Sequence, residues 1–303
     1  MKNIFKVFRN YIEFVIFIIL KNILGLFSFN FASNVGGILV GFFGKFTKYE
    51  QIIKNNLKVL NLNDEKSSKL TNENLKETGK VFFEFFNLNK FDWKNIDFDN
   101  IQIMDEIKSH KGPKIFISAH IGNWELTRNF ILRHGFTLHS VYRHANNEMI
   151  DNFIQKNRKE NNAFFYKKGS ESAKSMIKAL KQNEDLALLI DQRDSSGLEI
   201  DFFGKKALAT DGFANLAIRY KTMICPVYSI RNQNNKFQII FEKPLRYEEY
   251  KNYDDANIIL FDTPGMERSI QFPENLISKL PKGEKYALAG SISENNLENI
   301  ANL

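Results

Sequence analysis

The sequence predicts an α/β domain in which a largely parallel sheet is flanked by helices, preceded by a membrane-associated N-terminal helix. Two observations support this fold class. Between residues 114 and 242, short segments rich in β-branched and aromatic residues alternate with segments of helical periodicity, which is typical of strands joined by helical crossovers. Before that region, residues 14–44 form a long apolar stretch of the kind that binds membranes.

This apolar stretch is the first predicted element. It comprises 31 positions whose only charged residue is Lys21, and basic residues lie on both sides of it. Asparagine and serine interrupt it, so two membrane-bound arrangements remain open: a spanning helix near Tyr11 to Phe31, or an interfacial helix in one leaflet. A buried core helix is the alternative to both. No small-residue cleavage site follows a compact core, so we expect no signal peptide and assign residues 1–44 as a membrane anchor.

A polar, helical region follows the anchor between Gly44 and Lys94. In its second half, Phe82, Phe85 and Phe86 recur at roughly helical spacing. These rings are expected either to fill the core or to line an apolar groove that leads to the site.

The stretch from residue 114 to residue 130 contains the junction around which the chain is organised. Residues 115–117 have the β-branched and aromatic composition of a buried strand. Gly122 and Asn123 are turn and helix-cap residues, so a helix should begin near Asn123.

His120 and Glu125 lie on either side of this turn. On a continuous helix they would lie about 140° apart around the axis, whereas a strand, a glycine turn and a first helical turn bring them together. In that geometry the Glu125 carboxylate accepts the Nδ1 proton of His120 and leaves Nε2 free as a general base. A histidine at a strand end is also often an ordinary hydrogen-bonded residue, so the spacing alone does not establish catalysis.

Strands and helices alternate downstream of the junction. The predicted strands are 138–142, 163–166, 186–190, 223–230 and 237–242, and the predicted helices are 148–159, 171–181 and 211–220. His120, Arg143 and Asp191 each follow a predicted strand. Because sites in parallel sheets form at the carboxyl ends of strands, we expect these three residues to share one site.

Composition and missing motifs exclude several classes of function. A net charge of +7 and a pI near 9.2 favour an anionic partner, such as acidic lipid headgroups, an acidic carrier protein or nucleic acid. The basic residues are dispersed without an aromatic-basic RNA motif, so we expect no nucleic acid partner. The single cysteine, Cys225, lies in an apolar strand pattern and is expected to be buried rather than nucleophilic. The chain has no phosphate-binding glycine loop and no H-E-x-x-H or C-x-x-C pattern, so neither a cofactor nor a metal is expected.

Three sequence blocks resemble one enzyme family. AHIGNWE at 119–125 is similar to the H-x4-D/E block of the lysophospholipid acyltransferase superfamily, and specifically of its lipid A late acyltransferase branch, the lauroyl and myristoyl transferases. LLIDQ at 188–192 and FFGKKALATDG at 202–212 look like the second and third blocks of that branch, in the same order. The resemblance covers roughly residues 14–245.

This resemblance implies a glycerolipid acyltransferase-like fold with its catalytic domain at residues 45–249. It implies an enzyme on the cytoplasmic face of the inner membrane that moves a fatty acyl group from acyl carrier protein to a hydroxyl of a lipid A precursor. It further implies that Gly122, Asn123, Gln192 and Gly204, which lie in the matching blocks, contact the substrates.

The candidate residues have roles that suit this reaction. His120 would take the proton of the alcohol, and Glu125 would orient the imidazole and stabilise its cationic form. Arg143 would donate to the developing oxyanion or to a phosphate of the acceptor, unless it forms a structural salt bridge. Asp191 would pair with Arg143, contact the acceptor or cap its strand.

Two departures from related enzymes bear on this assignment. The Pro-Glu-Gly-Thr type block with which glycerol phosphate acyltransferases hold their acceptor is missing, which favours the lipid A branch over a lysophospholipid acyltransferase. The chain also lacks the aromatic, His- and Arg-rich ending of the lipid A branch, so we expect residues 250–303 to form an atypical, loosely packed tail. The alternative class is a non-catalytic, membrane-attached protein that binds lipid or an acidic partner.

Overall fold

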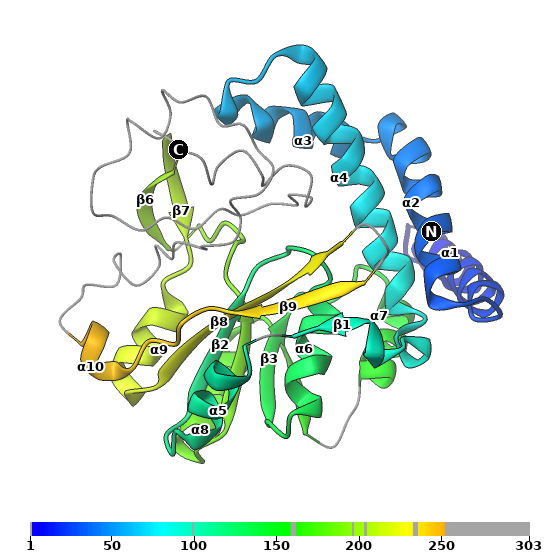
Figure 1. The fold of residues 1–303 in the computed structure, drawn as a ribbon. Coiled ribbons are helices and arrows are strands. Elements are labelled where there is room, and N and C mark those ends of the chain that lie inside the picture. Colours follow the sequence, from blue (N-terminus) through cyan, green and yellow to red (C-terminus); the bar gives the residue numbers. More distant parts are fainter. Residues whose placement is uncertain are drawn as a thin grey trace.

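The computed structural model describes residues 2–98, 100–158, 162–195, 197–202, 205–232 and 236–251 (Figure 1). The strands are β1 (Ile96–Asp97), β2 (Lys114–Ser118), β3 (Leu138–Tyr142), β4 (Ala163–Lys167), β5 (Asp185–Leu189), β6 (Leu198–Phe202), β7 (Lys205–Ala209), β8 (Met223–Arg231) and β9 (Phe237–Phe241). The α-helices are α1 (Lys2–Leu24), α2 (Phe29–Phe43), α3 (Lys48–Leu57), α4 (Asp64–Phe85), α5 (Ile101–Ser109), α6 (Trp124–Arg133), α7 (Glu148–Arg158), α8 (Ser170–Lys181), α9 (Gly212–Tyr220) and α10 (Tyr247–Tyr250).

The apolar N-terminal stretch forms two helices, α1 and α2, instead of one. The chain breaks at residues 25–28, and Ser28 caps α2 by accepting the backbone N–H of Phe31 at 3.2 Å. In the described part of the chain, no helix is both long enough and apolar enough to cross a membrane. The predicted spanning helix near Tyr11 to Phe31 is therefore not present as one continuous helix.

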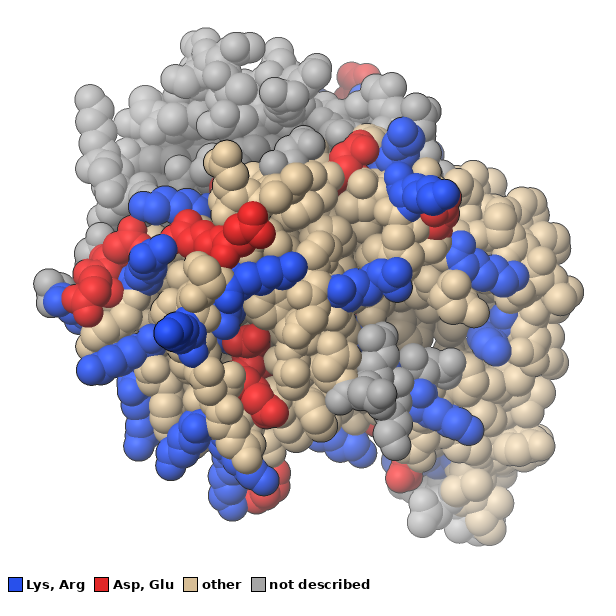
Figure 2. Space-filling view, turned by 60° about the horizontal axis from the view of Figure 1, so that its bottom comes forward, with Lys and Arg blue, Asp and Glu red and all other residues tan. Residues whose placement is uncertain are grey.

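Both N-terminal helices expose large apolar side chains. Examples that are at least half exposed are Phe5, Phe8, Ile16, Ile38 and Phe42. In Figure 2 the right-hand side of the molecule, where Figure 1 places α1 and α2, carries fewer charged side chains than the left-hand side. α2 also buries Phe29, Ala32 and Gly36, so this stretch has a packed face as well as an exposed apolar face, and its binding to a membrane stays a prediction.

Glycines allow α2 and α4 to pack unusually closely. A Cβ at Gly36 would lie 2.5 Å from the carbonyl oxygen of Gly79, and a Cβ at Gly79 would lie 2.3 Å from that of Gly36. Real Cβ atoms do not approach so closely, so glycine at both positions sets the distance between the helices. The position of α4 beside the sheet is thereby tied to that of α2.

The main sheet has seven strands in the order β1-β9-β8-β2-β5-β3-β4. β2 is parallel to both β5 and β8, and β3 is parallel to both β4 and β5. β9 is antiparallel to β8, whereas β1 is parallel to β9. The prediction of a largely parallel sheet flanked by helices is confirmed.

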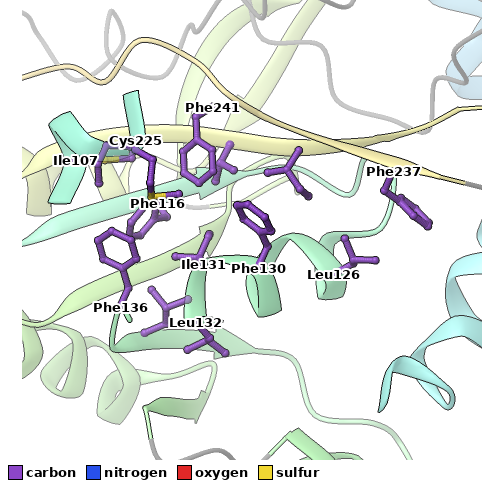
Figure 3. Close-up of a cluster of buried hydrophobic side chains, with 14 of the residues drawn as sticks. Ile107, Phe116, Leu126, Phe130, Ile131, Leu132, Phe136, Cys225, Phe237 and Phe241 are labelled. Atoms are coloured by element: carbon purple, nitrogen blue, oxygen red, sulfur yellow. The ribbon is translucent and has the colours of Figure 1, made fainter. Parts of the chain in front are cut away.

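Alternating residues of β2 divide the interior into two cores. Phe116 packs with α5 and α6 on one face of the sheet, where Phe130 and Ile131 are also buried (Figure 3). Ile115 and Ile117 pack with α8 and α9 on the other face. Cys225 is buried in the first core, and burial raises the pKa of its thiol, so its predicted structural character is confirmed.

The predicted strands and helices of residues 114–242 are found with each end displaced by at most one residue, apart from the last residue of the 148–159 helix, which lies outside the described residues. The elements that were not predicted include the short β1, the helix α5 before β2, the antiparallel hairpin of β6 and β7, and the short α10. Most of the predicted tail, residues 252–303, also lies outside the described residues.

Candidate active site

Two residues build the turn between β2 and α6. Gly122 has a φ of +54°, and a Cβ there would lie 1.9 Å from the carbonyl oxygen of Ser229 on β8, so only glycine fits. The fully buried Asn123 caps α6 by accepting a hydrogen bond of 2.9 Å from the backbone N–H of Leu126. The predicted helix start near Asn123 is confirmed.

Asp191 holds His120 at two points. The imidazole Nδ1 lies 2.8 Å from Asp191 Oδ1, and the backbone N–H of His120 donates to Oδ2 at 2.9 Å. A carboxylate can only accept, so the ring proton belongs on Nδ1 and the Nε2 lone pair is available. Burial alone would raise the pKa of Asp191, but hydrogen bonds and charge from His120 outweigh it and hold that pKa below its ordinary value. At neutral pH Asp191 is therefore an anion that stabilises a cationic imidazole.

Strand order explains why Asp191 is the partner of His120. β2 and β5 are neighbouring parallel strands in which Ser118 pairs with Leu189. His120 and Asp191 each follow the last residue of their strand by two positions, so the register brings them together at the carboxyl edge of the sheet. The prediction that Glu125 accepts the Nδ1 proton of His120 is wrong, because α6 directs Glu125 toward different partners.

Glu125 lies in the first turn of α6 and pairs with two arginines. Its carboxylate, which is almost completely buried, contacts Arg158 at the end of α7 and lies 3.6 Å from Arg128 on the next turn of α6. The guanidinium groups of Arg158 and Arg128 also lie 5.4 and 4.8 Å from the ring centroid of Phe165. Glu125 therefore fixes the position of two largely buried cations.

A single cavity of about 380 Å³ connects these groups, a size typical of small-molecule sites. Its polar lining includes His120, Glu125, Arg128, Arg143, Arg158 and Gln192. Its apolar lining includes Phe116, Ile131, Phe165, Ala187, Leu188 and Val227. Because Phe116, Ile131 and Val227 belong to the buried core between α6 and the sheet, the cavity reaches from the polar edge into the apolar interior.

The other candidate residues are placed as follows. Arg143, with an exposed side chain, follows β3 and lines the same cavity as His120. The amide nitrogen of Gln192 lies 3.4 Å from His120 Nε2. His120, Arg143 and Asp191, the three strand-end residues expected to share a site, are thus brought together. Asp191 pairs with His120, however, and not with Arg143. Gly204 lies outside the described residues.

Several residues of the site were not singled out from the sequence, among them Trp124, Arg128 and Arg158. Trp124 packs its ring against that of His120, with centroids 4.9 Å apart, and its place in the AHIGNWE block could have indicated this. Arg158 lies 33 residues from Glu125 in a polar helix with several charges, and no local pattern distinguishes it.

The ionisable groups around the cavity suit proton transfer and anion binding. Three arginines and one carboxylate, that of Glu125, line the cavity together with His120, so its lining has a positive balance. Within the described residues, no group of three or more His, Cys, Asp or Glu side chains could hold a metal ion.

Comparison with known proteins agrees with the sequence blocks. The family model described as bacterial lipid A biosynthesis acyltransferase matches residues 2–262, which is most of the chain. A search among curated protein sequences found no match.

Proposed function

Because this chain belongs to the bacterial lipid A biosynthesis acyltransferase family, we propose that it moves a fatty acyl group from an acyl carrier protein thioester to a hydroxyl of a lipid A precursor. The family supports the reaction class and an acceptor of the lipid A type. The observation that carries the mechanism is the imidazole of His120, held by Asp191 at the edge of a cavity with an apolar interior.

In this mechanism His120 is the general base. Its Nε2 takes the proton from the acceptor hydroxyl while the oxygen attacks the thioester carbonyl, and the negative Asp191 stabilises the imidazolium that forms. When the tetrahedral intermediate collapses, the carbon–sulfur bond breaks and the thiolate receives the proton from Nε2. The products are an ester and a free thiol, and His120 returns to its neutral form.

The arginines of the cavity supply positive charge to the reaction. The intermediate carries a negative oxygen, and lipid A precursors carry phosphates, so the positive balance of the cavity favours both. Arg158 is held by Glu125 and therefore presents its charge in a fixed position, whereas Arg143 is exposed at the edge. Glu125 thus acts in this proposal by orienting Arg158, and Asp191 takes over the orienting role first expected of Glu125.

The apolar part of the cavity would hold the acyl chain. Its walls come from α6, β2, β3, β4, β5 and β8, and several of the lining residues belong to the core. Burying a methylene group there stabilises the complex by about 0.8 kcal/mol, which makes a long chain a strong contributor to binding.

We further propose that α1 and α2 bind the cytoplasmic face of the inner membrane as interfacial helices. The exposed apolar side chains of both helices support this, because they would otherwise remain in water. Lys6 and Arg9 near the start of α1 suit acidic headgroups. In this arrangement the acceptor lipid and the cavity lie at the same surface.

The proposed function is tested with purified protein in vesicles, acyl carrier protein charged with a fatty acid, and two separate acceptors. One acceptor is a lipid A precursor and the other is a lysophospholipid, and products are identified by mass spectrometry. We expect an acylated lipid A precursor whose mass increases by one acyl group. Acylation of the lysophospholipid alone would overturn the acceptor, and stoichiometric binding of either lipid without product would support the non-catalytic alternative.

A further inference from the structure

A buried carboxylate lies next to the turn that separates His120 from Glu125. Glu84 of α4 has no exposed surface, and each of its oxygens has two partners. Oε1 accepts from Ser33 Oγ at 2.5 Å and lies 2.6 Å from Arg231 Nη1. Oε2 accepts from Asn123 Nδ2 at 2.7 Å and from Arg231 Nη2 at 2.9 Å. Glu84 therefore joins α2, β8 and the turn before α6 at one point.

Asn123 connects this cluster to the active site. Its amide nitrogen donates to Glu84, and its amide oxygen accepts the backbone N–H of Leu126. Because an ionised Glu84 can only accept, it selects the amide orientation in which the oxygen caps α6. The backbone of Asn123 is also tied to β8, since its N–H donates to Ser229 Oγ at 2.9 Å.

We propose that Glu84 is a positioning residue for acyl transfer: through Asn123 it fixes the turn that sets His120 and the Glu125–Arg158 pair around one cavity. The catalytic part of this inference rests on the proposed function. The physical reason is that His120 and Glu125 lie within three residues of Asn123, so a shift of the turn displaces both. A misplacement of about 1 Å is enough to lower a catalytic rate roughly 10²-fold.

Glu84 can serve as a fixed point because its own surroundings are rigid. The close approach of Gly36 and Gly79 fixes α4 against α2. Gly79 lies on α4, five residues before Glu84. Arg231 is held from its other side by Glu77 at 2.9 Å. Burial alone would lower the pKa of Arg231, but the attraction of Glu84 and Glu77 outweighs it and raises that pKa, so the guanidinium stays charged.

Stability alone is a weak reason for such a cluster. A buried ion pair gives little net stability compared with well-packed apolar residues of the same volume. Apolar residues in its place could not accept a hydrogen bond from the amide of Asn123. The specific contribution of Glu84 is therefore the orientation of that amide.

This role is tested by exchanging the donor and the acceptor of the hydrogen bond between Asn123 and Glu84. In Glu84→Gln, one carboxylate oxygen becomes an N–H₂ group. Both oxygens of Glu84 face Arg231, so in either orientation this group meets an N–H of Arg231, and in one of them it also meets the N–H₂ of Asn123. The hold of residue 84 on Asn123 is thereby weakened or lost. In Asn123→Asp, two carboxylates face each other. In the double variant Glu84→Gln/Asn123→Asp, residue 84 donates to residue 123, the second oxygen of Asp can still cap α6, and the net charge is that of the native protein.

The readouts are kcat and KM per folded molecule, together with hydrogen exchange of the segment 120–127. We expect Glu84→Gln to lower kcat about tenfold to a hundredfold with little change in KM, and to speed exchange of this segment at least about tenfold. The double variant should recover most of both losses. A purely structural role would lower the unfolding free energy but leave kcat per folded molecule unchanged.

Glu77→Gln is the matched control, because it removes a carboxylate from the same arginine without touching Asn123. Its kcat and exchange should change clearly less than those of Glu84→Gln, because Glu84 still holds both Arg231 and Asn123. Native kcat and native exchange in Glu84→Gln, or a double variant no better than the worse single variant, would overturn the inference. If the native protein shows no acyl transfer, the proposed function fails, while the exchange rates still decide whether Glu84 holds the turn.

Discussion

His120 and Asp191 are 71 residues apart in the chain, yet the imidazole Nδ1 lies 2.8 Å from the carboxylate Oδ1. The contact results from the pairing of β2 with β5, in which the last residues of the two strands, Ser118 and Leu189, lie opposite each other. It gives the imidazole a defined tautomer and a buried anion behind it, which are the two properties a histidine base requires.

Asp191→Asn should therefore lower kcat by about 10²-fold or more, although it keeps the shape of the side chain. The neutral amide no longer stabilises the imidazolium, and its N–H₂ end can turn the ring to the wrong tautomer. Steady-state kinetics with acyl carrier thioester measures the loss, and circular dichroism checks the fold. A rate within twofold of the native one would show that Asp191 has no catalytic part.

Glu125→Gln is expected to act on both stability and activity. It leaves Arg158 and Arg128 largely buried without their carboxylate, which lowers the unfolding free energy by about 3 kcal/mol. Because Arg158 is then no longer fixed in the cavity, kcat should fall at least about tenfold. Urea unfolding and kinetics on the same preparation measure the two effects. Unchanged kcat in a destabilised variant would assign Glu125 a structural role only.

The pH dependence of stability should include a contribution from Asp185, at the start of β5. Burial raises its pKa to about 6. The nearby Lys114 lowers this pKa, but by less than burial raises it. The folded protein therefore binds this proton more tightly than the unfolded chain does. The resulting stabilisation is complete below the ordinary pKa near 3.8 and is lost as the pH rises through about 6.

Asp185→Asn, which cannot ionise, should flatten this part of the pH profile. Between about pH 4 and pH 7, the native protein should lose up to roughly 3 kcal/mol of unfolding free energy more than the variant does. Urea unfolding at several pH values measures both curves. Parallel curves for the two proteins would contradict the raised pKa.

Membrane binding should depend on the exposed apolar side chains of α2. Ile38→Glu/Phe42→Glu places two charges on positions that are 68% and 58% exposed, so the fold should tolerate them while vesicle binding falls. Lys174→Glu, on the exposed surface of α8, changes the net charge by the same amount and is the control. Flotation with vesicles of acidic phospholipid measures the difference. Equal flotation of all three proteins would show that α2 does not contact the bilayer.

The sequence was most informative where structure depends on neighbouring residues. The turn at Gly122 and the cap at Asn123 could be predicted because a left-handed φ and an N-cap each restrict the residue at one position. Apart from the hairpin of β6 and β7, the strands and helices between residues 114 and 242 could be predicted from periodicity. The gathering of His120, Arg143 and Asp191 followed from a general rule about parallel sheets.

Contacts between distant segments could not be predicted in the same way. That His120 pairs with Asp191 instead of Glu125 depends on β5 lying beside β2, and strand order is not contained in local periodicity. Arg158 reaches Glu125 only because α7 returns to α6. The break at residues 25–28 was also missed, although Gly25 after α1 and Ser28 before α2 are residue types that often end and begin helices.

The most direct test of the account is the single-turnover rate of acyl transfer in His120→Ala, with saturating acyl carrier thioester and a lipid A precursor in vesicles. The account predicts a rate about 10² to 10⁴ times lower than that of the native protein, with unchanged vesicle binding and a native unfolding transition. A folded, membrane-bound His120→Ala variant that transfers the acyl group at a near-native rate would contradict it.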